Sequence, residues 1–369
     1  MFFNEEKFLD IFKNTEKISF DKFYKNFKVK TSNKLVPLSN YKVNKVHTKP
    51  LYEHIINKNE YLKRFYETSL NFSNDISIKE KAMTSKKLDN NEQVKYKNII
   101  RNMHFKEILK NTHSGFENNP TYLNILEDLY NNNIIDYKLL TPSALYYIKE
   151  NRIGSVFSSF YFRASILNPY LVYSLNHCLL KGTKIFTPTL GWSSYCYGFL
   201  ECPYVEEYVG TDVINSVCKK TKTFAAKHYP EKKVEIFNSP SENLSKNTSF
   251  IKKYTNHFDV VFFSPPYFKL ELYSGKNQST NMYRSYEEWL VKYWEATIQL
   301  CFKVLQSNGR LCYILSGYGK NLEYDLVTDM NTITSKYFTL KKIIPMQNKN
   351  VHVTNHRTTG EQIIIFEKK

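Results

Sequence analysis

The second half of the chain alternates short apolar runs with polar or helix-length stretches. Six such runs occur between residue 184 and the C-terminus, and they read KIFTP, EEYVGTDV, KVEIF, FDVVFFSPP, GRLCYILS and EQIIIFEK. This alternation is typical of a buried, mostly parallel sheet covered by helices, so it predicts an α/β fold. The stretch FTLKKIIPMQ, followed by a turn at Thr359–Gly360, predicts an antiparallel strand pair that closes the sheet.

Residues 1–145 have a different texture, rich in Lys, Asn and Tyr and poor in glycine. Ranges 59–70 and 122–130 repeat apolar residues at three- and four-residue spacing, which indicates helices. The polar stretch 76–93 between them is expected to be a loop or a linker. We therefore predict two domains: a mainly helical, basic domain of unassigned role over 1–145, with a nucleic acid or a protein partner as candidate ligand, and an α/β domain over 146–369.

The composition favours a nucleic-acid partner and disfavours several other classes of protein. A formal charge of +17 attracts polyanions, although a solvated basic surface is the alternative. The six cysteines form no CxxC pair, and His352 and His356 therefore lack the partners of a zinc finger, so no metal is expected. The charged N-terminus and the absence of any long apolar window predict a soluble protein, cytoplasmic or nuclear, without a membrane span.

The strongest local signal is the tetrapeptide Ser264-Pro265-Pro266-Tyr267, which follows the apolar run at 258–263. In open α/β sheets, ligands bind beyond the carboxyl ends of the strands, where this tetrapeptide would project. Two prolines fix φ and remove two N–H donors, which leaves a stiff loop that offers a hydroxyl and carbonyl oxygens. Such acceptors suit an amino group, and the tyrosine offers a face to a planar ring. The alternative is a rigid structural turn.

A second signal lies upstream, in the run I-F-T-P-T-L-G-W-S-S at 185–194 and in the later V-G-T-D at 209–212. Gly191 allows close approach of a ligand to the turn after the first strand. Asp212, roughly 20 residues further on, ends the second strand, where an acid accepts hydrogen bonds from ribose hydroxyls. This pattern predicts a nucleotide-type cofactor.

Together these motifs resemble the S-adenosylmethionine-dependent DNA amino-methyltransferases, which modify N4 of cytosine or N6 of adenine. The resemblance covers roughly residues 163–369 and includes the run SPPYFxLExYS, a later Gln-Ser, and Y-x-x-W-L, which are similar to a phage- and virus-type branch. Two positions depart from the family pattern: Thr187 stands where the family usually has Asp, and Ser193 replaces a glycine.

The resemblance implies a Rossmann-like seven-stranded sheet with helices on both faces and S-adenosylmethionine across the strand ends. Ser241 and Glu242, after the third strand, are candidates for contacting adenine, and Asn168 precedes the first strand; helix capping explains Ser241 and Asn168 almost as well. The complete set of implied cofactor-binding residues is Thr187, Pro188, Gly191, Trp192, Asp212, Ser241, Glu242 and Asn168.

The implied reaction is methyl transfer to an exocyclic amino nitrogen of a base, with DNA preferred over RNA and the base flipped out or single-stranded. Ser264 and Pro265 would bind the amino group, Pro266 would stiffen the loop, and Tyr267 would stack on the ring. Serine at the head of the tetrapeptide leans toward cytosine, and adenine stays open. The alternatives are an RNA adenine-N6 methyltransferase, or a catalytically lapsed fold that serves as a nucleic-acid-binding or scaffold subunit. An activating protein partner would also fit the altered first motif.

Overall fold

The computed structural model describes residues 2–12, 18–32, 34–116, 120–317, 324–347 and 360–369. The chain forms two compact units: unit 1 comprises Met1–Phe72 and Arg101–Ser165, and unit 2 comprises Ser73–Ile100 and Ile166–Lys369. Relative to the predicted boundary after residue 145, residues 146–165 belong to unit 1 and residues 73–100 belong to unit 2. His352, His356 and Thr359 lie outside the described residues.

Unit 1 is mainly helical, as the apolar spacing predicted. Its helices are α1 (Glu5–Leu9), α2 (Phe20–Asn26), α3 (Lys49–Ile56), α4 (Lys58–Ser69), α6 (Tyr122–Asn131), α7 (Pro142–Lys149) and α8 (Ile153–Phe160). The helix α5 (Lys95–Met103) belongs to unit 2 up to Ile100 and to unit 1 from Arg101. A small sheet of order β2-β1-β4 adds β1 (Lys28–Lys30), antiparallel to β2 (Leu35–Pro37) and parallel to β4 (Ile134–Asp136). Aromatic rings fill the core, and Phe8 contacts the rings of Phe12, Phe65 and Phe105.

The remaining elements of unit 1 are short. They are the strand β3 (His113–Ser114), the 3₁₀ turns at Asp10–Phe12, Leu38–Asn40, Lys45–Thr48 and Tyr137–Leu140, and a π-helical turn at Glu107–Asn111.

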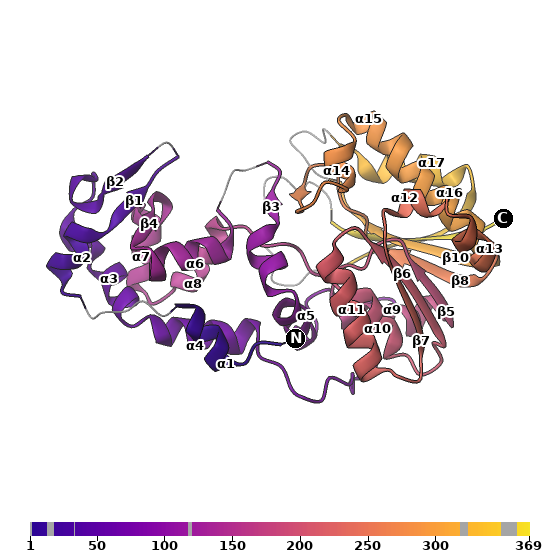
Figure 1. Ribbon diagram of the computed structural model, residues 1–369, viewed down its shortest axis with the longest axis horizontal. Coiled ribbons are helices and arrows are strands. Elements are labelled where there is room, and N and C mark those ends of the chain that lie inside the picture. The colour runs from indigo at the N-terminus through magenta and orange to yellow at the C-terminus, as the bar shows by residue number, and fades with distance from the viewer. Residues whose placement is uncertain (1, 13–17, 33, 117–119, 318–323, 348–359) are drawn as a thin grey trace. The chain divides into compact units, whose positions relative to one another are not determined.

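Unit 2 is built on a seven-stranded sheet of order β11-β12-β10-β8-β5-β6-β7 (Figure 1). The strands are β5 (Lys184–Thr187), β6 (Glu207–Asp212), β7 (Lys233–Asn238), β8 (Phe258–Phe263), β10 (Leu305–Leu315), β11 (Phe338–Pro345) and β12 (Gln362–Lys368). Neighbouring strands from β10 to β7 are parallel, whereas β12 runs antiparallel to both β10 and β11. The predicted closing antiparallel pair is therefore confirmed.

Helices cover both faces of this sheet, which confirms the predicted Rossmann-like architecture (Figure 1). One face carries α9 (Pro169–Leu175), α10 (Ser194–Leu200) and α11 (Asn215–His228), and the other carries α12 (Ser241–Leu244), α13 (Thr248–Tyr254), α16 (Ala296–Val304) and α17 (Leu326–Ser335). Shorter elements are β9 (Glu271–Leu272), α14 (Ser279–Met282), α15 (Tyr286–Trp289) and the π-helical turns Asn176–Leu180 and Leu290–Glu295.

The middle of the sheet is apolar on both faces, as expected of strands covered on each side. Val261, Phe262 and Phe263 of β8 are fully buried. Trp294 is also fully buried, and its ring lies 5.6 Å from that of Phe263, so this tryptophan packs its helical turn on the sheet.

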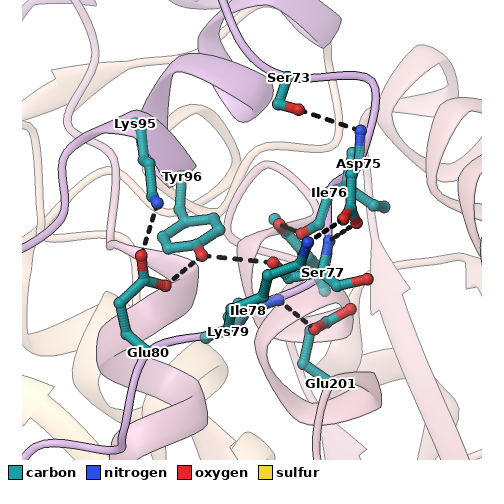
Figure 2. Close-up of polar contacts among 11 residues, drawn as sticks. Ser73, Asp75, Ile76, Ser77, Ile78, Lys79, Glu80, Lys95, Tyr96 and Glu201 are labelled. Carbon is teal, nitrogen blue, oxygen red and sulfur yellow. Dashed lines mark hydrogen bonds and ion pairs between the residues drawn. The ribbon is translucent and has the colours of Figure 1, made fainter.

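The polar stretch 76–93 was expected to be a loop or linker, and most of it is indeed irregular but fixed to unit 2 (Figure 2). The backbone N–H of Ile78 donates to the Glu201 carboxylate at 2.6 Å. The carboxylate of Glu80 accepts from Lys95 at 2.5 Å and from the hydroxyl of Tyr96. Polar side chains anchor this segment, which explains why apolar periodicity did not reveal its attachment.

Within the described residues, no helix is long and apolar enough to cross a membrane.

Candidate active site

The predicted site residues follow the carboxyl ends of four neighbouring parallel strands. Thr187 ends β5, Asp212 ends β6, Ser241 and Glu242 follow β7, and Ser264 follows β8. The strands β8, β5, β6 and β7 are consecutive in the sheet. Because the carboxyl ends of parallel strands share one edge, the sheet brings these segments together at the place where α/β domains bind ligands.

A left-handed turn follows β5. Gly191, Trp192 and Ser193 have φ values of +51°, +58° and +69°, and the N–H of Ser194 closes the turn by donating to the Gly191 carbonyl at 3.0 Å. We call these three residues the Gly191 turn. A non-glycine residue in this conformation costs about 1–2 kcal/mol, and such strain is kept mainly where function requires it.

Surrounding contacts hold this turn in place. Ser193 stands where the family has a glycine, and it is fully buried. Its hydroxyl lies 2.6 Å from the hydroxyl of Thr221 on α11. The Trp192 ring centroid lies 5.8 Å from that of Tyr273. The serine at position 193 is thus accommodated by a buried hydrogen bond.

Asp212 links the Gly191 turn to the end of β6. Its carboxylate accepts from the backbone N–H of Leu190 at 3.2 Å and from that of Ile214 at 2.9 Å. Burial raises the pKa of Asp212, and the backbone N–H donors oppose that rise. The residue is half-buried, and a carboxylate has about four lone-pair sites, so two N–H bonds leave acceptor capacity for a ligand hydroxyl.

Two predicted cofactor-binding residues next to β5 turn inward. Thr187 is fully buried, and its hydroxyl lies 2.6 Å from that of Tyr208 on β6. Pro188 is buried as well. The structure therefore places the Thr187 side chain between strands and not at the ligand edge, which is consistent with a residue that replaces the family aspartate without taking over its contacts.

The segment after β7 begins α12. Pro240 is its N-cap, so the alternative interpretation of Ser241 as the cap is wrong; its hydroxyl lies instead 2.9 Å from that of Thr297 on α16. The buried Glu242 carboxylate accepts from the Tyr283 hydroxyl at 3.2 Å. Burial raises the pKa of Glu242, and the hydrogen bond from Tyr283 acts in the opposite direction.

We call Ser264–Tyr267, the residues after β8, the Ser264 loop. The Ser264 hydroxyl donates to the Ile314 carbonyl of β10 at 3.2 Å. The Tyr267 hydroxyl accepts from the backbone N–H of Ser316 at 2.8 Å, and only 8 % of the residue is exposed. Pro265 is buried and Pro266 is half-buried. The loop is therefore fixed at both ends, against β10 and against the residue that directly follows it.

The segment following this loop packs on aromatic rings. The Phe268 ring lies 5.7 Å from that of Tyr286 and 5.9 Å from that of Trp289. Glu271 is buried and accepts from the Tyr273 hydroxyl at 2.7 Å. This burial excludes a role as a solvent-exposed surface charge.

Asn168 does not present its side chain to the strand ends. Its side-chain oxygen caps α9 by accepting from Tyr170 N–H at 3.0 Å, and its amide donates to the Glu92 carbonyl at 2.6 Å. The residue is fully buried. The capping interpretation is confirmed, and the amide adds a bond to the segment 73–100.

Two tyrosines that sequence reasoning missed also belong to this region. Tyr195 donates to and accepts from the backbone of Ser264. Tyr293 lies in the π-helical turn Leu290–Glu295, is 3 % exposed, and its hydroxyl has no hydrogen-bond partner among the described residues. Burial raises the pKa of Tyr293, and the nearby carboxylates of Glu242 and Asp212 add to that rise. The chain has 29 tyrosines, so residue type alone could not single these two out. No group of three or more potential metal ligands occurs among the residues placed by the structure.

Comparison with known proteins gives no matching family model and no matching curated protein. Among solved structures, the chain is similar to part of TrmN from Thermus thermophilus, with 13 % identity and a TM-score of 0.37 over 55 % of this chain and 49 % of that chain. The N-methyltransferase NodS from Bradyrhizobium japonicum WM9, solved with S-adenosyl-L-homocysteine, matches with 10 % identity and a TM-score of 0.35 over 54 % of this chain and 83 % of that chain. The PH0226 protein from Pyrococcus horikoshii OT3 matches with 14 % identity and a TM-score of 0.34, over 54 % and 89 % of the two chains. The chain thus spans about half the length of TrmN.

Proposed function

We propose that the protein transfers a methyl group from S-adenosylmethionine to the exocyclic amino nitrogen of a nucleic-acid base, with DNA the preferred substrate. The observation that carries the proposal is the pairing of two loops at one sheet edge. The Gly191 turn follows β5, the Ser264 loop follows the adjacent β8, and Tyr195 contacts both. A cofactor loop and an acceptor-rich loop side by side are what group transfer between two bound molecules requires.

The residues at this edge fit the cofactor. The Gly191 turn is strained, and Leu190, the residue directly before it, donates its backbone N–H to Asp212. The remaining lone pairs of the Asp212 carboxylate suit ribose hydroxyls. The buried Tyr293 hydroxyl has no partner among the described residues, and Glu242 lies within electrostatic range of it. A buried hydroxyl of this kind costs free energy unless a ligand completes its hydrogen bonding. S-adenosylmethionine, when bound, supplies an electrophilic methyl group.

The Ser264 loop suits an amino substrate. Because the Ser264 hydroxyl donates its hydrogen to the Ile314 carbonyl, the lone pairs of its oxygen are available to accept from an incoming N–H. The Pro265 carbonyl offers a second acceptor, and neither proline has an N–H that would compete. Two acceptors on one amino group favour a pyramidal nitrogen with its lone pair available for attack. Since Tyr267 is only 8 % exposed, a base can stack on its ring only after neighbouring groups move aside.

The charge distribution supports a polyanionic substrate. The net charge is +17, and the segment after the Ser264 loop carries the exposed cations Lys269, Lys276 and Arg284. Cations beside a catalytic loop contact phosphates and hold the strand while the target base leaves its stack.

One observation favours a second candidate function, a lapsed methyltransferase fold that binds nucleic acid only. Thr187 replaces the family aspartate, and its side chain is buried against Tyr208. The intact Ser264 loop and Asp212 support activity instead, because a chain without catalysis has no need of both.

Calorimetric titration with S-adenosylmethionine tests the proposal on the wild type, Asp212→Asn and Asp259→Asn. Asp259 is a matched control, since its carboxylate also accepts backbone N–H bonds, from Thr183 and Lys184, at the opposite edge of the same sheet. We expect saturable binding that Asp212→Asn weakens and Asp259→Asn retains. Transfer of a tritiated methyl group to DNA or RNA, with nucleoside analysis, then identifies the substrate and base. Nucleic-acid affinity without cofactor binding would support the lapsed fold.

A further inference from the structure

Tyr195 is a buried tyrosine in the first turn of α10 that contacts the Ser264 loop through its hydroxyl. The hydroxyl accepts from the backbone N–H of Ser264 at 3.1 Å and donates to the carbonyl of the same residue at 3.4 Å. The residue is 2 % exposed, and its ring packs edge-on against Phe262 of β8 at 5.1 Å. One side chain thus satisfies both backbone polar groups of the residue that heads the loop.

The same ring lies against the Gly191 turn. A Cβ atom placed on Gly191 would lie 2.2 Å from Cζ of Tyr195 and 2.6 Å from its hydroxyl oxygen. The absence of a side chain at Gly191 therefore makes room for Tyr195. Together with φ = +51°, this contact gives a second physical reason for glycine at this position.

We infer that Tyr195 is a positioning residue that couples the Gly191 turn to the Ser264 loop, so that a ligand in the cofactor site raises the affinity of the base site. The inference rests on the proposed function of these two loops. The Gly191 turn is strained, and a cofactor that contacts it restricts its backbone and the Tyr195 ring beside it. The fixed hydroxyl then restricts the Ser264 backbone, and less ordering remains for the substrate base to impose. By linkage, the nucleic acid must raise cofactor affinity by the same factor.

A chemical role for the hydroxyl is excluded by its environment. Burial raises the pKa of Tyr195 well above neutral, so the hydroxyl stays protonated and cannot act as a general base. The hydrogen bond that it donates to the Ser264 carbonyl also occupies its only hydrogen. Tyr195 therefore acts through the position of Ser264, and substitution should leave the pH profile of methyl transfer unchanged.

The test is a thermodynamic cycle on the wild type, Tyr195→Phe and Tyr197→Phe. The affinity for a fluorescent single-stranded DNA oligonucleotide is measured with and without saturating S-adenosylhomocysteine. Tyr197 is a matched control, because it lies on the same helix, is fully buried, and donates its hydroxyl to the Ile76 carbonyl, away from both loops. We expect S-adenosylhomocysteine to raise wild-type DNA affinity at least about fivefold, the usual lower bound for coupled sites. Tyr195→Phe should bring this factor close to one and leave each separate affinity within about threefold, while Tyr197→Phe keeps the wild-type factor.

A second measurement needs no substitution. Hydrogen–deuterium exchange of the wild type follows the Ser264 amide, which precedes two prolines that have no amide hydrogen. S-adenosylhomocysteine should slow its exchange. An unchanged exchange rate, or equal coupling factors in the wild type and Tyr195→Phe, would overturn the inference while the proposed function stands. Loss of coupling in both tyrosine variants would also overturn the inference, because it would show that Tyr195 has no more than the structural role of Tyr197. Failure of the wild type to bind S-adenosylhomocysteine would overturn the proposed function itself.

Discussion

The Tyr267 hydroxyl accepts a hydrogen bond from the backbone N–H of Ser316 at 2.8 Å and thereby joins the Ser264 loop to the end of β10. Ser316 is fully buried, so this N–H has no access to water. The bond fixes the last residue of the loop, while the Ser264 hydroxyl fixes its first residue on Ile314. Ile314 belongs to β10, the strand adjacent to β8, and Ser316 directly follows that strand.

This relationship predicts different outcomes for two substitutions of Tyr267. Tyr267→Phe leaves the Ser316 N–H unpaired and should lower the free energy of unfolding by about 1–3 kcal/mol. It retains the ring and should therefore retain part of the methyl transfer, whereas Tyr267→Ala should abolish it. Urea denaturation and methyl-transfer assays measure both effects. Equal inactivity of the two variants would show that the hydroxyl, and not the ring, is what the substrate needs.

Gly191→Ala should both destabilise the protein and weaken cofactor binding. The new methyl group would clash with the Tyr195 ring, and alanine is strained at φ = +51°. We expect a loss of at least about 1 kcal/mol in the free energy of unfolding, since αL conformation alone costs that much. Gly360→Ala is the control, because a methyl group there meets no atom of the described residues within 4 Å. Unchanged S-adenosylmethionine affinity in Gly191→Ala would place the cofactor away from this turn.

Glu242→Gln should raise the free energy of unfolding at pH 7 and weaken cofactor binding. Because burial raises the folded-state pKa of Glu242 above its ordinary value of 4.5, ionisation costs folding free energy at neutral pH. That cost is fully present above the raised pKa and disappears as the pH falls below 4.5. The amide variant should therefore be more stable than wild type at pH 7, and the difference should vanish near pH 4. Urea denaturation at both pH values checks the sign, and calorimetry should show weaker cofactor binding in the variant. A variant less stable than wild type at pH 7 would mean that the Tyr283 hydrogen bond outweighs burial.

Tyr293→Phe should be neutral or stabilising in the protein without cofactor, because it removes a buried hydroxyl that has no partner among the described residues. It should also reduce the rise in melting temperature that S-adenosylmethionine produces. Tyr130→Phe in unit 1 is the matched control: its hydroxyl is equally buried and equally without a described partner. We expect that variant to keep the full cofactor-induced rise. An undiminished rise in Tyr293→Phe would remove Tyr293 from the cofactor site.

Regular patterns made most of unit 2 predictable from the sequence. The apolar runs marked β5, β6, β8, β10 and β12, because strands buried on both faces are largely apolar. The edge strand β7 is partly exposed and mixed in sequence, and its place in the alternation marked it instead. The positions of Asp212 and Ser264 followed from the rule that polar residues directly after such strands meet at one edge.

Contacts between residues distant in sequence were not predictable. The inward orientation of Thr187 depends on Tyr208, a hydroxyl on the neighbouring strand. The attachment of residues 73–100 depends on single polar bonds such as Ile78 to Glu201, which leave no periodic signal. Tyr195 and Tyr293 look like ordinary core tyrosines until their hydroxyl partners, or the lack of them, are known.

The most direct test of the central claim is single-turnover transfer of a tritiated methyl group to DNA by wild type and Ser264→Ala, both saturated with S-adenosylmethionine. We predict label in N4-methylcytosine or N6-methyladenine with the wild type, and a rate lower by about 10²-fold or more in Ser264→Ala, at unchanged cofactor affinity. Equal rates for the two proteins would contradict the assignment of the Ser264 loop as the catalytic loop. Cofactor binding with no labelled base, on either DNA or RNA, would contradict the proposed reaction.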